Sequence, residues 1–449
     1  MNIELLRKYN VPGPRYTSYP TVPYWDATTI NTELWQQQAV QTFTATNTTT
    51  GISVYMHLPF CEKLCTFCGC NKRITVNHDV ELPYIETILS EWKLYLMLLP
   101  DVPVVREVHL GGGTPTFFSA QHLDMLLNLF FETVIKHEHF ELSFEAHPNV
   151  INVEQMQVLY DHGSRRISLG IQDFDDTVQR AINRTQTYET VATVTEQARA
   201  IGYTSVNYDL IYGLPFQTTK NIEETIRLVN IQRPERIAFY SYAHVPWVAK
   251  GQRGYNDTDL PKDEVKRNLY ETGRMLLEQN GYTEIGMDHF ALPTDSLYIA
   301  MENKTLHRNF MGYTHSYTEL MIGLGVSAIS DSWGAFVQNN KTFEEYVSIV
   351  QSGVLPVFRG HLLNAEDRKI RSIILNIICH FEHTFNASDT IDVYNERLKQ
   401  LENDALLHWQ NDTLIVAKDA RAFIRNICMA FDERLHLHQP RTSVFSQTV

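Results

Sequence analysis

Short apolar runs alternate with amphipathic stretches through the first half of the chain. Runs typical of β-strands lie near residues 52–57, 107–111, 140–145, 166–171, 205–210 and 236–242. Helical patterns lie between them near 80–98, 120–136, 153–162, 174–200 (interrupted) and 219–230. Strands that alternate with helices form a parallel sheet with right-handed crossovers. Six such units predict an α/β fold, an open partial (β/α)6 barrel, which a further helix (262–280) and strand (284–287) extend or cover.

The two ends of the chain follow other patterns. Residues 1–25 are rich in Tyr, Pro and Arg and show neither a helical nor a strand period, which is typical of an extended arm. From 364 onward, helical patterns near 365–380, 389–403 and 418–435 surround a hairpin-like segment at 406–416. We therefore predict an arm with a short helix (1–50), the barrel (51–300), a connecting segment (301–363) and a mostly helical, winged-helix-like C-terminal domain (364–449).

Composition and charge indicate which partners and which location to expect. The 449 residues carry a net charge of −14, and the C-terminal domain itself has more acidic than basic residues, so we expect no nucleic-acid partner. The sequence has no apolar run of the ~18 residues that a membrane span needs. We expect no export signal, because residues Met1–Glu4 are acidic and lack an apolar core. We expect a cytoplasmic protein without a membrane partner.

Four of the six cysteines, Cys61, Cys65, Cys68 and Cys70, lie within ten residues. In a large chain of this kind, clustered cysteines indicate metal binding or catalysis rather than disulfides. A structural zinc site is the alternative, but it would need a second knuckle that does not follow. Cys-x3-Cys-x2-Cys resembles the motif of the radical S-adenosylmethionine (SAM) superfamily, in which three thiolates hold a [4Fe–4S] cluster and the open iron chelates SAM. Cys379 and Cys428 sit in apolar segments and are predicted to be buried.

Polar residues follow each predicted strand where β/α barrels build their active sites. A glycine run in this position lets the backbone approach a ligand closely. Acids and amides on the same rim suit the hydroxyl and ammonium groups of SAM. The strand-end residues are Tyr55 and His57, Gly111–Pro115, Glu145, Gln172 and Asp173, Asn207 and Asp209, and Tyr240–His244.

The chain resembles one radical SAM family in particular, the oxygen-independent coproporphyrinogen III dehydrogenases (oxidases) of haem synthesis. The likeness runs from the arm to the C-terminal domain, and the stretch Cys68–Lys72 and the arm are its most particular parts. The matching stretches are 12–21, 55–72, 111–115, 170–174, 209–215, 286–290, 307–310, 325–329 and 425–428.

The resemblance implies the cofactors and the residues that bind them. A [4Fe–4S] cluster is expected on Cys61, Cys65 and Cys68, with Cys70 present but not a ligand. Two SAM molecules are expected, and the segment 301–363 is expected to contact substrate or SAM. The implied contacts are Tyr55, Gly112, Glu145 and Ile329 for the cluster-bound SAM, and Phe67, Gly113, Thr114, Gln172, Arg184, Asp209 and Ala243 for the second.

The implied reaction is oxidative decarboxylation of two propionate side chains to vinyl groups, giving protoporphyrinogen IX. The partners would be the tetrapyrrole and an unknown electron donor and acceptor, and the protein would be a monomer. A tetracarboxylate substrate needs cations in this acidic protein. The candidates are Arg15, Lys63, Lys72, Arg73 and Arg308.

The chain departs from the family pattern at three positions. After Glu145 it has His147 and Asn149, where an acidic residue and an arginine are expected around the proline, and Met311 stands where glutamine is expected. These departures bear on the substrate or the second SAM, and not on the cluster. Two alternatives stay open: a related radical SAM haem chaperone, and an anaerobic haem-degrading radical SAM methyltransferase. The arm and Cys70 favour the dehydrogenase over the chaperone, whereas the sequence separates the methyltransferase poorly.

Overall fold

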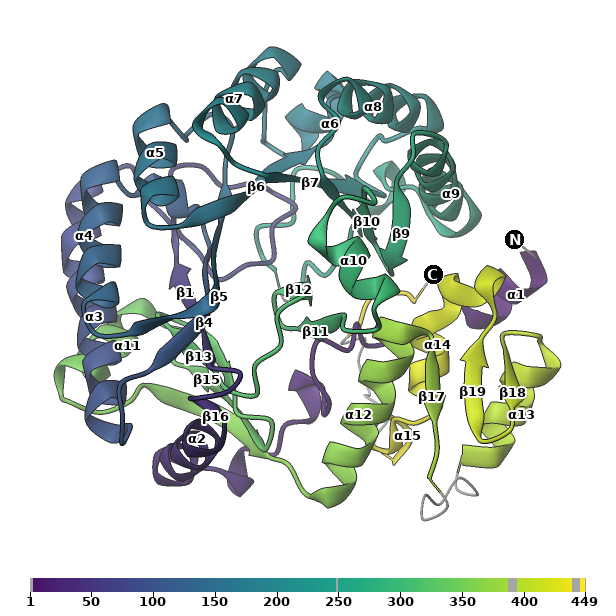
Figure 1. Cartoon of the computed structure of the whole chain (residues 1–449). Helices are drawn as coiled ribbons and strands as arrows, with labels where there is room; N and C mark the ends of the chain where they lie inside the picture. Colours follow the sequence, from purple (N-terminus) through teal and green to yellow (C-terminus); the bar gives the residue numbers. More distant parts are fainter. Residues whose placement is uncertain (1–2, 248, 387–393, 438–444, 449) are drawn as a thin grey trace.

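The computed structural model describes residues 3–247, 249–386, 394–437 and 445–448. Six parallel strands form a curved sheet in the order β1-β4-β5-β6-β7-β8, with helices on its outer side (Figure 1). This confirms the predicted partial barrel. The strands are β1 (Ile52–Leu58), β4 (Val104–Gly112), β5 (Ile135–Ala146), β6 (Ser164–Gln172), β7 (Ser205–Tyr212) and β8 (Arg236–Ser241).

The predicted helices lie between these strands with small changes in their bounds. They are α3 (Glu81–Leu98), α4 (Ala120–Phe131), α5 (Val153–Asp161), α6 (Asp176–Ala181), α7 (Tyr188–Ile201) and α8 (Thr219–Gln232). The helix predicted to reach 136 ends at Phe131. Strand β5 begins at Ile135 instead, because Ile135 and Lys136 pair with Val104 and Val105 of β4.

The sheet continues beyond the six strands at both edges, so that it has twelve strands in all. After α9 (Asp263–Gln279), the strands β9 (Thr283–Gly286) and β10 (His289–Ala291) form an antiparallel extension beside β8. At the other edge β13 (Met321–Leu324) pairs in parallel with β1 and leads to β14 (Ile329–Asp331), β15 (Ala335–Asn339) and β16 (Val357–Leu362). The strands of this second extension were not predicted. The division into domains at 300 and 363 stays a prediction, but residues 321–362 contribute strands to the barrel's sheet.

The N-terminal arm begins with a helix, α1 (Ile3–Tyr9), so the prediction of an entirely extended arm is wrong there. The helix forms because it buries Leu6 and Tyr9, and Tyr9 packs against Phe423 of the C-terminal domain. The rest of the arm up to the short helix η1 (Val22–Tyr24) lacks regular secondary structure, as predicted. It is followed by η2 (Ala27–Thr29) and α2 (Thr32–Thr46). Figure 1 places both chain ends beside the C-terminal domain.

The C-terminal domain combines helices with a three-stranded sheet in the order β17-β19-β18. The predicted hairpin is present. The helix predicted near 389–403 is described from Asn395 onward, since 387–393 lie outside the described residues. The helix predicted over 418–435 is divided, because the Asp432 carboxylate accepts the Leu435 N–H and begins a new helix. The elements are α12 (Ala365–His380), β17 (Glu382–Thr384), α13 (Asn395–Asn403), β18 (Leu407–Gln410), β19 (Thr413–Val416), η7 (Lys418–Phe423), α14 (Ile424–Met429) and α15 (Glu433–Leu437).

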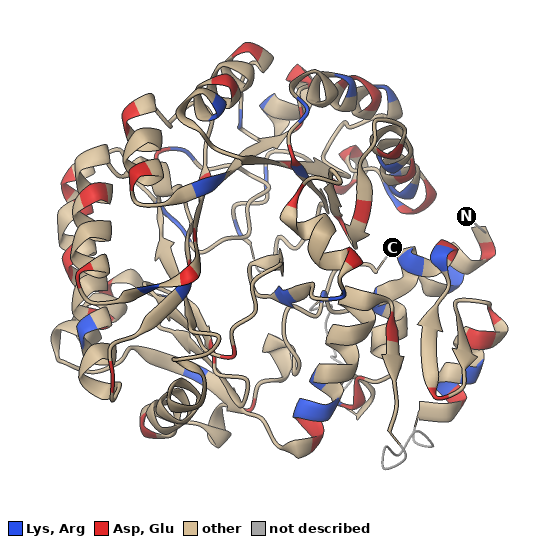
Figure 2. Cartoon of the chain, in the orientation of Figure 1, with Lys and Arg blue, Asp and Glu red and all other residues tan. Residues whose placement is uncertain are grey.

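Charged residues of both signs are mixed along the outer helices (Figure 2). Across the described ranges, no helix combines the length and apolar character needed to cross a membrane. Cys379 and Cys428 are buried, as predicted.

A buried glutamate joins the added strands to the first barrel helix. Glu91 on α3 is 0% exposed and accepts hydrogen bonds from the Gly325 N–H (2.8 Å), the Tyr346 hydroxyl (2.7 Å) and the Asn339 side chain (2.6 Å). Burial raises the pKa of Glu91 to about 7. The folded chain therefore binds the proton of the Glu91 carboxyl group more tightly than the unfolded chain does. The stabilising contribution of Glu91 is largest at low pH and is lost as pH rises through about 7.

Replacing Glu91 by alanine is expected to lower the free energy of unfolding by about 3 kcal/mol, because three buried donors lose their acceptor. The fall of stability between about pH 5 and pH 8 should also become shallower in this variant, because the titrating group is gone. Urea unfolding at several pH values measures both effects. Glu86→Ala, at an exposed position of the same helix, is the control. A loss of stability equal in the two variants would contradict the prediction.

Candidate active site

A cavity of about 320 Å³ lies at the carboxyl ends of the parallel strands, where the predicted site residues were expected. Its wall combines the cysteine loop with the ends of β4, β5, β6 and β7. The predicted residues that line it are Cys61, Cys65, Phe67, Cys68, Gly112, Gly113, Thr114, Glu145, Gln172, Arg184 and Asp209. We call this the cluster cavity.

The cysteine loop is held in place by backbone contacts with the end of α6. The Thr66 N–H donates to the Ile182 carbonyl (3.0 Å), and the Asn183 side chain donates to the Leu64 carbonyl (2.7 Å). The short strands β2 (Phe60–Cys61) and β3 (Arg73–Ile74) pair where the loop begins and ends. These contacts fix the loop so that Cys61, Cys65 and Cys68 all face one cavity.

The three cysteines fit an iron–sulfur cluster better than a single ion. Among the described residues, no group of three or more His, Cys, Asp and Glu side chains is placed to hold one metal ion. Zinc would require such a convergence, whereas each cysteine of a cluster site binds a different iron. A hydrogen bond from the Cys70 thiol and the nearby Lys72 lower the pKa of Cys68 to about 6, which favours the thiolate that binds metal. Burial raises the pKa of Cys61 to about 11.

At Gly112 and Gly113 the backbone lies against the cavity, and the neighbouring atoms leave no room for a side chain. A Cβ atom on Gly112, whose φ is +113°, would lie 2.7 Å from the His57 ring. A Cβ atom on Gly113 would lie 2.5 Å from the backbone of Pro59. Both glycines are therefore required by the close approach of this run to His57 on β1 and to Pro59, which follows that strand. They leave main-chain polar groups beside the cavity.

Two carboxylates, Glu145 and Asp209, face the cluster cavity. Burial raises the pKa of Glu145, but the His109 side chain and the Gly112 N–H together outweigh it, and the net shift is downward. Burial and the charge of Glu145 raise the pKa of Asp209 to about 6. The two groups repel each other across the cavity, so a cationic ligand between them would be stabilised.

Arg184 contacts the cysteine loop directly. Its Nη2 donates to the Gly170 carbonyl (2.6 Å), and its Nη1 lies 3.6 Å from the Cys65 sulfur. Its Nε is buried without a hydrogen-bond partner. Arg184 therefore joins β6 to the loop and has a donor still unused. Gln172 lines the cavity with a left-handed backbone, at φ +69°.

Three predicted residues lie beside the cluster cavity and do not line it. Tyr55 on β1 stacks on His109, and its hydroxyl lies 3.2 Å from the His57 ring. The Ala243 carbonyl accepts a hydrogen bond from Gln252, which also donates to the Phe67 carbonyl. The Ile329 carbonyl would lie 2.4 Å from a Cβ atom on Gly323, which pairs with Tyr55 in register. Their contacts with SAM stay predictions.

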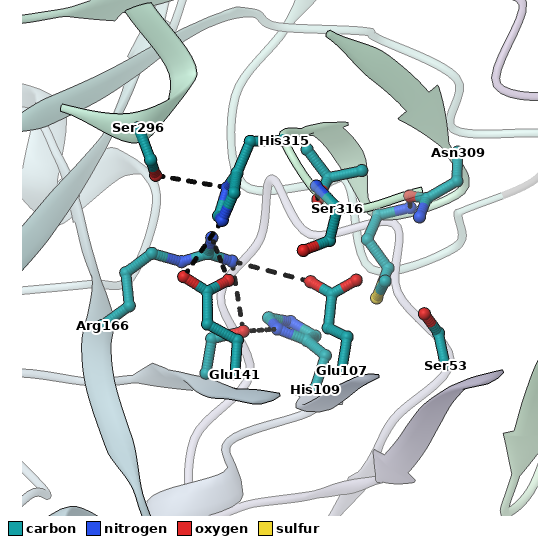
Figure 3. Close-up of polar contacts among 12 residues, drawn as sticks. Ser53, Glu107, His109, Glu141, Arg166, Ser296, Asn309, His315 and Ser316 are labelled. Atoms are coloured by element: carbon teal, nitrogen blue, oxygen red, sulfur yellow. Dashed lines mark hydrogen bonds and ion pairs between the residues drawn. The ribbon is translucent and has the colours of Figure 1, made fainter. Parts of the chain in front are cut away.

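A polar network fills the barrel interior next to the cluster cavity (Figure 3). Arg166 donates to Glu141 (3.2 Å) and to the Ser143 hydroxyl (3.2 Å), and it lies 4.0 Å from Glu107. His109 contacts Ser143 at 2.7 Å, and its other ring nitrogen lies 3.7 Å from Glu145. The network thus fixes the position of Glu145 through His109. A smaller cavity of about 110 Å³, the barrel cavity, lies among these residues.

The motifs did not single out several residues that hold the site together. Ser168 and Asn207 donate to Asp209 (both 2.9 Å), and His109 supports Glu145. The sequence marks Asn207 only as a strand-end residue. The alternation of side chains along the strands could have indicated these residues. Ser168 on β6 and His109 on β4 stand two or four residues before inward-facing positions, so they lie on the same face of the sheet.

The three departures from the family pattern occupy different places. His147 and Asn149 line the cluster cavity, and Met311 lines the barrel cavity. The His147 ring accepts the Asn149 N–H (3.1 Å), and the Asn149 side chain donates to the Thr185 carbonyl (2.8 Å). Burial, Arg184 and Lys63 lower the pKa of His147 to about 3, so its ring is neutral at physiological pH.

Replacing His147 by asparagine is expected to change kcat/KM for SAM by less than about threefold, because an asparagine side chain accepts the same turn hydrogen bond. The pH dependence of the rate between about pH 6 and pH 8 should not change, since His147 does not titrate there. Steady-state kinetics over this pH range tests both. A shift of the pH profile in this variant would show that His147 is charged during turnover.

Comparisons with known proteins agree with this site. Residues 55–229 match the Radical SAM superfamily. The chain is 36% identical to the oxygen-independent coproporphyrinogen III oxidase of Salmonella typhimurium and 35% identical to that of Escherichia coli K12, and each alignment covers 100% of this chain and 98% of the relative. The solved coproporphyrinogen III oxidase from Escherichia coli, described as a radical SAM enzyme, superimposes with a TM-score of 0.89 at 34% identity, covering 97% of this chain and 99% of that one. This chain belongs to the family of oxygen-independent coproporphyrinogen III oxidases.

Proposed function

We propose that this protein converts coproporphyrinogen III into protoporphyrinogen IX by oxidative decarboxylation of two propionate side chains to vinyl groups. One observation carries the proposal. The chain is similar to coproporphyrinogen III oxidases over its whole length, and its three motif cysteines open onto one cavity with the strand-end residues of the barrel. The reaction removes a hydrogen from an unactivated carbon, which side-chain acids and bases cannot do.

We further propose which residues hold the cofactors. Cys61, Cys65 and Cys68 would bind a [4Fe–4S] cluster through one iron each. The residues around the cluster cavity would bind SAM at the cluster and a second SAM beside it, with the division between the two that the family resemblance implies. When bound, the cluster and SAM supply an electron and a carbon-centred radical that can abstract hydrogen from the propionate β-carbon.

The protein's own residues position and shield the reactants. Glu145 stays ionised at physiological pH because the Gly112 N–H and His109 hold its charged form, so it can accept hydrogen bonds from bound hydroxyl or ammonium groups. Asp209 is held by Ser168 and Asn207 and offers a second carboxylate to a cationic ligand. Arg184 can direct its unused N–H toward a carboxylate.

We also propose that the enzyme works as a cytoplasmic monomer. It would receive electrons from a separate donor protein or molecule and pass electrons from the reaction to a separate acceptor. The net charge of −14 and the mixed charge of the outer helices support a freely dissolved protein. Sedimentation of the reconstituted enzyme would test the monomer, with a dimer as the contradicting result.

An anaerobic assay tests the function directly. The iron-reconstituted enzyme is incubated with SAM, a reductant, an electron acceptor and coproporphyrinogen III, and porphyrin product, CO2 and 5′-deoxyadenosine are measured together. All three should form. Haem binding without turnover would indicate the chaperone instead, and an opened tetrapyrrole formed from haem would indicate the methyltransferase.

A further inference from the structure

Five cations were candidates for the substrate carboxylates, and the structure separates them. Arg15 lies 3.4 Å from Asp288 and donates to the Ser241 carbonyl, and Arg73 is paired with Glu344. Lys63 and Lys72 line the cluster cavity, and Lys72 donates to the carbonyls of Cys68 and Cys70. Arg308 differs from all four, because it is buried and unpaired.

Arg308 on β11 (His307–Asn309) is only 7% exposed. Its Nε and Nη1 are buried without a hydrogen-bond partner, and among the described residues no carboxylate lies within ion-pair distance of it. A guanidinium stays charged at any physiological pH. Burying it without a partner removes its hydration, which lowers the stability of the folded state. Such a group indicates a place for an anion.

The surroundings of Arg308 leave it free for such a partner. It lines a small cavity of about 40 Å³ between the barrel, the arm and the C-terminal domain. The two acids of this cavity have other partners, since Asp288 lies beside Arg15 and the Tyr270 hydroxyl donates to Glu284 (2.6 Å). One water needs about 10–15 Å³ of such space, so the cavity has room for a carboxylate group but not for a tetrapyrrole ring.

A second unused donor lies beside Arg308, on the side of the barrel cavity. The Arg308 guanidinium packs over the Tyr313 ring (4.7 Å), and the His289 ring packs edge-on to Tyr313 (5.2 Å). His289 Nδ1 is buried without a partner, while its Nε2 lies 3.5 Å from the Tyr240 hydroxyl. Burial and the nearby arginines lower the pKa of His289 to about 3, so the ring is neutral. If Nε2 accepts from Tyr240, Nδ1 carries the proton and is a free donor.

We propose that Arg308, together with His289, binds a propionate carboxylate of the tetrapyrrole other than the one that reacts. This rests on the proposed function. The carboxylate is a remote one, because Arg308 and His289 do not line the cluster cavity, where the reacting propionate must lie. Tyr313 and His289 line the barrel cavity, which shares Glu145, Ser168 and Asp209 with the cluster cavity. A substrate side chain in the barrel cavity would therefore meet His289 and the Tyr313 ring, on which the Arg308 guanidinium packs.

The test replaces Arg308 by methionine, which keeps the length and removes the charge. In the reconstituted enzyme, KM for coproporphyrinogen III should rise about tenfold or more, and kcat should change by less than about threefold. Cleavage of SAM in the absence of substrate should not change. The melting temperature should stay the same or rise, because an uncompensated buried charge is removed. Arg308→Lys should recover part of the affinity.

Arg371→Met is the matched control, because Arg371 is 6% exposed but paired with Asp331 (3.0 Å). It should lower the melting temperature without a selective rise in KM. An unchanged KM in Arg308→Met would overturn the inference and leave the proposed function standing. A wild-type enzyme that does not decarboxylate would overturn the proposed function itself. If free propionate raised the melting temperature only when Arg308 is present, and KM were unchanged, the site would bind a free carboxylate and not the substrate.

Discussion

Replacing Cys65 by serine is expected to abolish iron–sulfur cluster binding and SAM cleavage. Cys65 lies in the loop that α6 holds against the cavity, 3.6 Å from Arg184, and a serine hydroxyl there is a poor ligand for iron that thiolates prefer. Cys70 also borders the cavity, but it stands outside the three-residue motif and should not replace Cys65. The measurements are iron and sulfide content, the electron paramagnetic resonance signal of the reduced protein, and 5′-deoxyadenosine formation.

Cys379→Ala is the control for the Cys65 variant. Cys379 is buried in α12, far along the chain from the loop, so its replacement should leave the iron content unchanged even if stability falls. Full iron content and continued SAM cleavage in Cys65→Ser would show that the cluster assignment is wrong. Loss of iron in both variants would instead indicate a general folding defect.

Replacing Arg184 by alanine is expected to reduce decarboxylation by about a hundredfold or more, while the cluster still assembles. Arg184 connects the Gly170 carbonyl to the cysteine loop and has one buried N–H without a partner, so its loss should affect a ligand carboxylate next to β6. Although Arg184 contacts Cys65, the loop is also held by the hydrogen bonds from Thr66 to Ile182 and from Asn183 to Leu64, so the cluster should still assemble. Iron content, SAM cleavage without substrate, and porphyrin formation separate these effects.

The control for Arg184 is Arg180→Ala, an exposed arginine on α6 in the same region. It should not change any of the three measurements. If Arg184→Ala lost its cluster, the arginine would be a support for the loop and not a contact of the second SAM. If it decarboxylated at the wild-type rate, the assignment of Arg184 to a ligand would be wrong.

The barrel could be predicted from the sequence because its strands and helices are long and strongly periodic. The four strands β13–β16 were missed because they have three to six residues each and lie among glycines and serines such as Gly323, Gly325 and Ser327. Strands of this length carry little periodicity of their own. They form because β1 offers them an unpaired edge and Glu91 fixes their loops.

The candidate site could be predicted in part. The cysteine spacing and the glycine run are local signals, and both lead to the cluster cavity. The sequence names Arg308 only as one of five candidate cations, because it does not show which of them is buried without a carboxylate partner. Likewise, the division of the last predicted helix depends on Asp432, whose carboxylate also accepts from the Tyr16 hydroxyl more than four hundred positions away in the chain (3.0 Å).

The N-terminal arm is hydrogen-bonded to residues 425–448, and these contacts determine the order in which parts of the protein can fold. Pro12 pairs with Gln447, the Thr448 hydroxyl donates to the Tyr9 carbonyl (2.6 Å), and Arg425 donates to the Pro14 carbonyl (2.9 Å). A ribosome makes residues 9–14 long before residues 425–448. The barrel's strands, which end at residue 362, are therefore made while the arm still lacks these partners, and the arm can take its place only after residues 425–448 have been made.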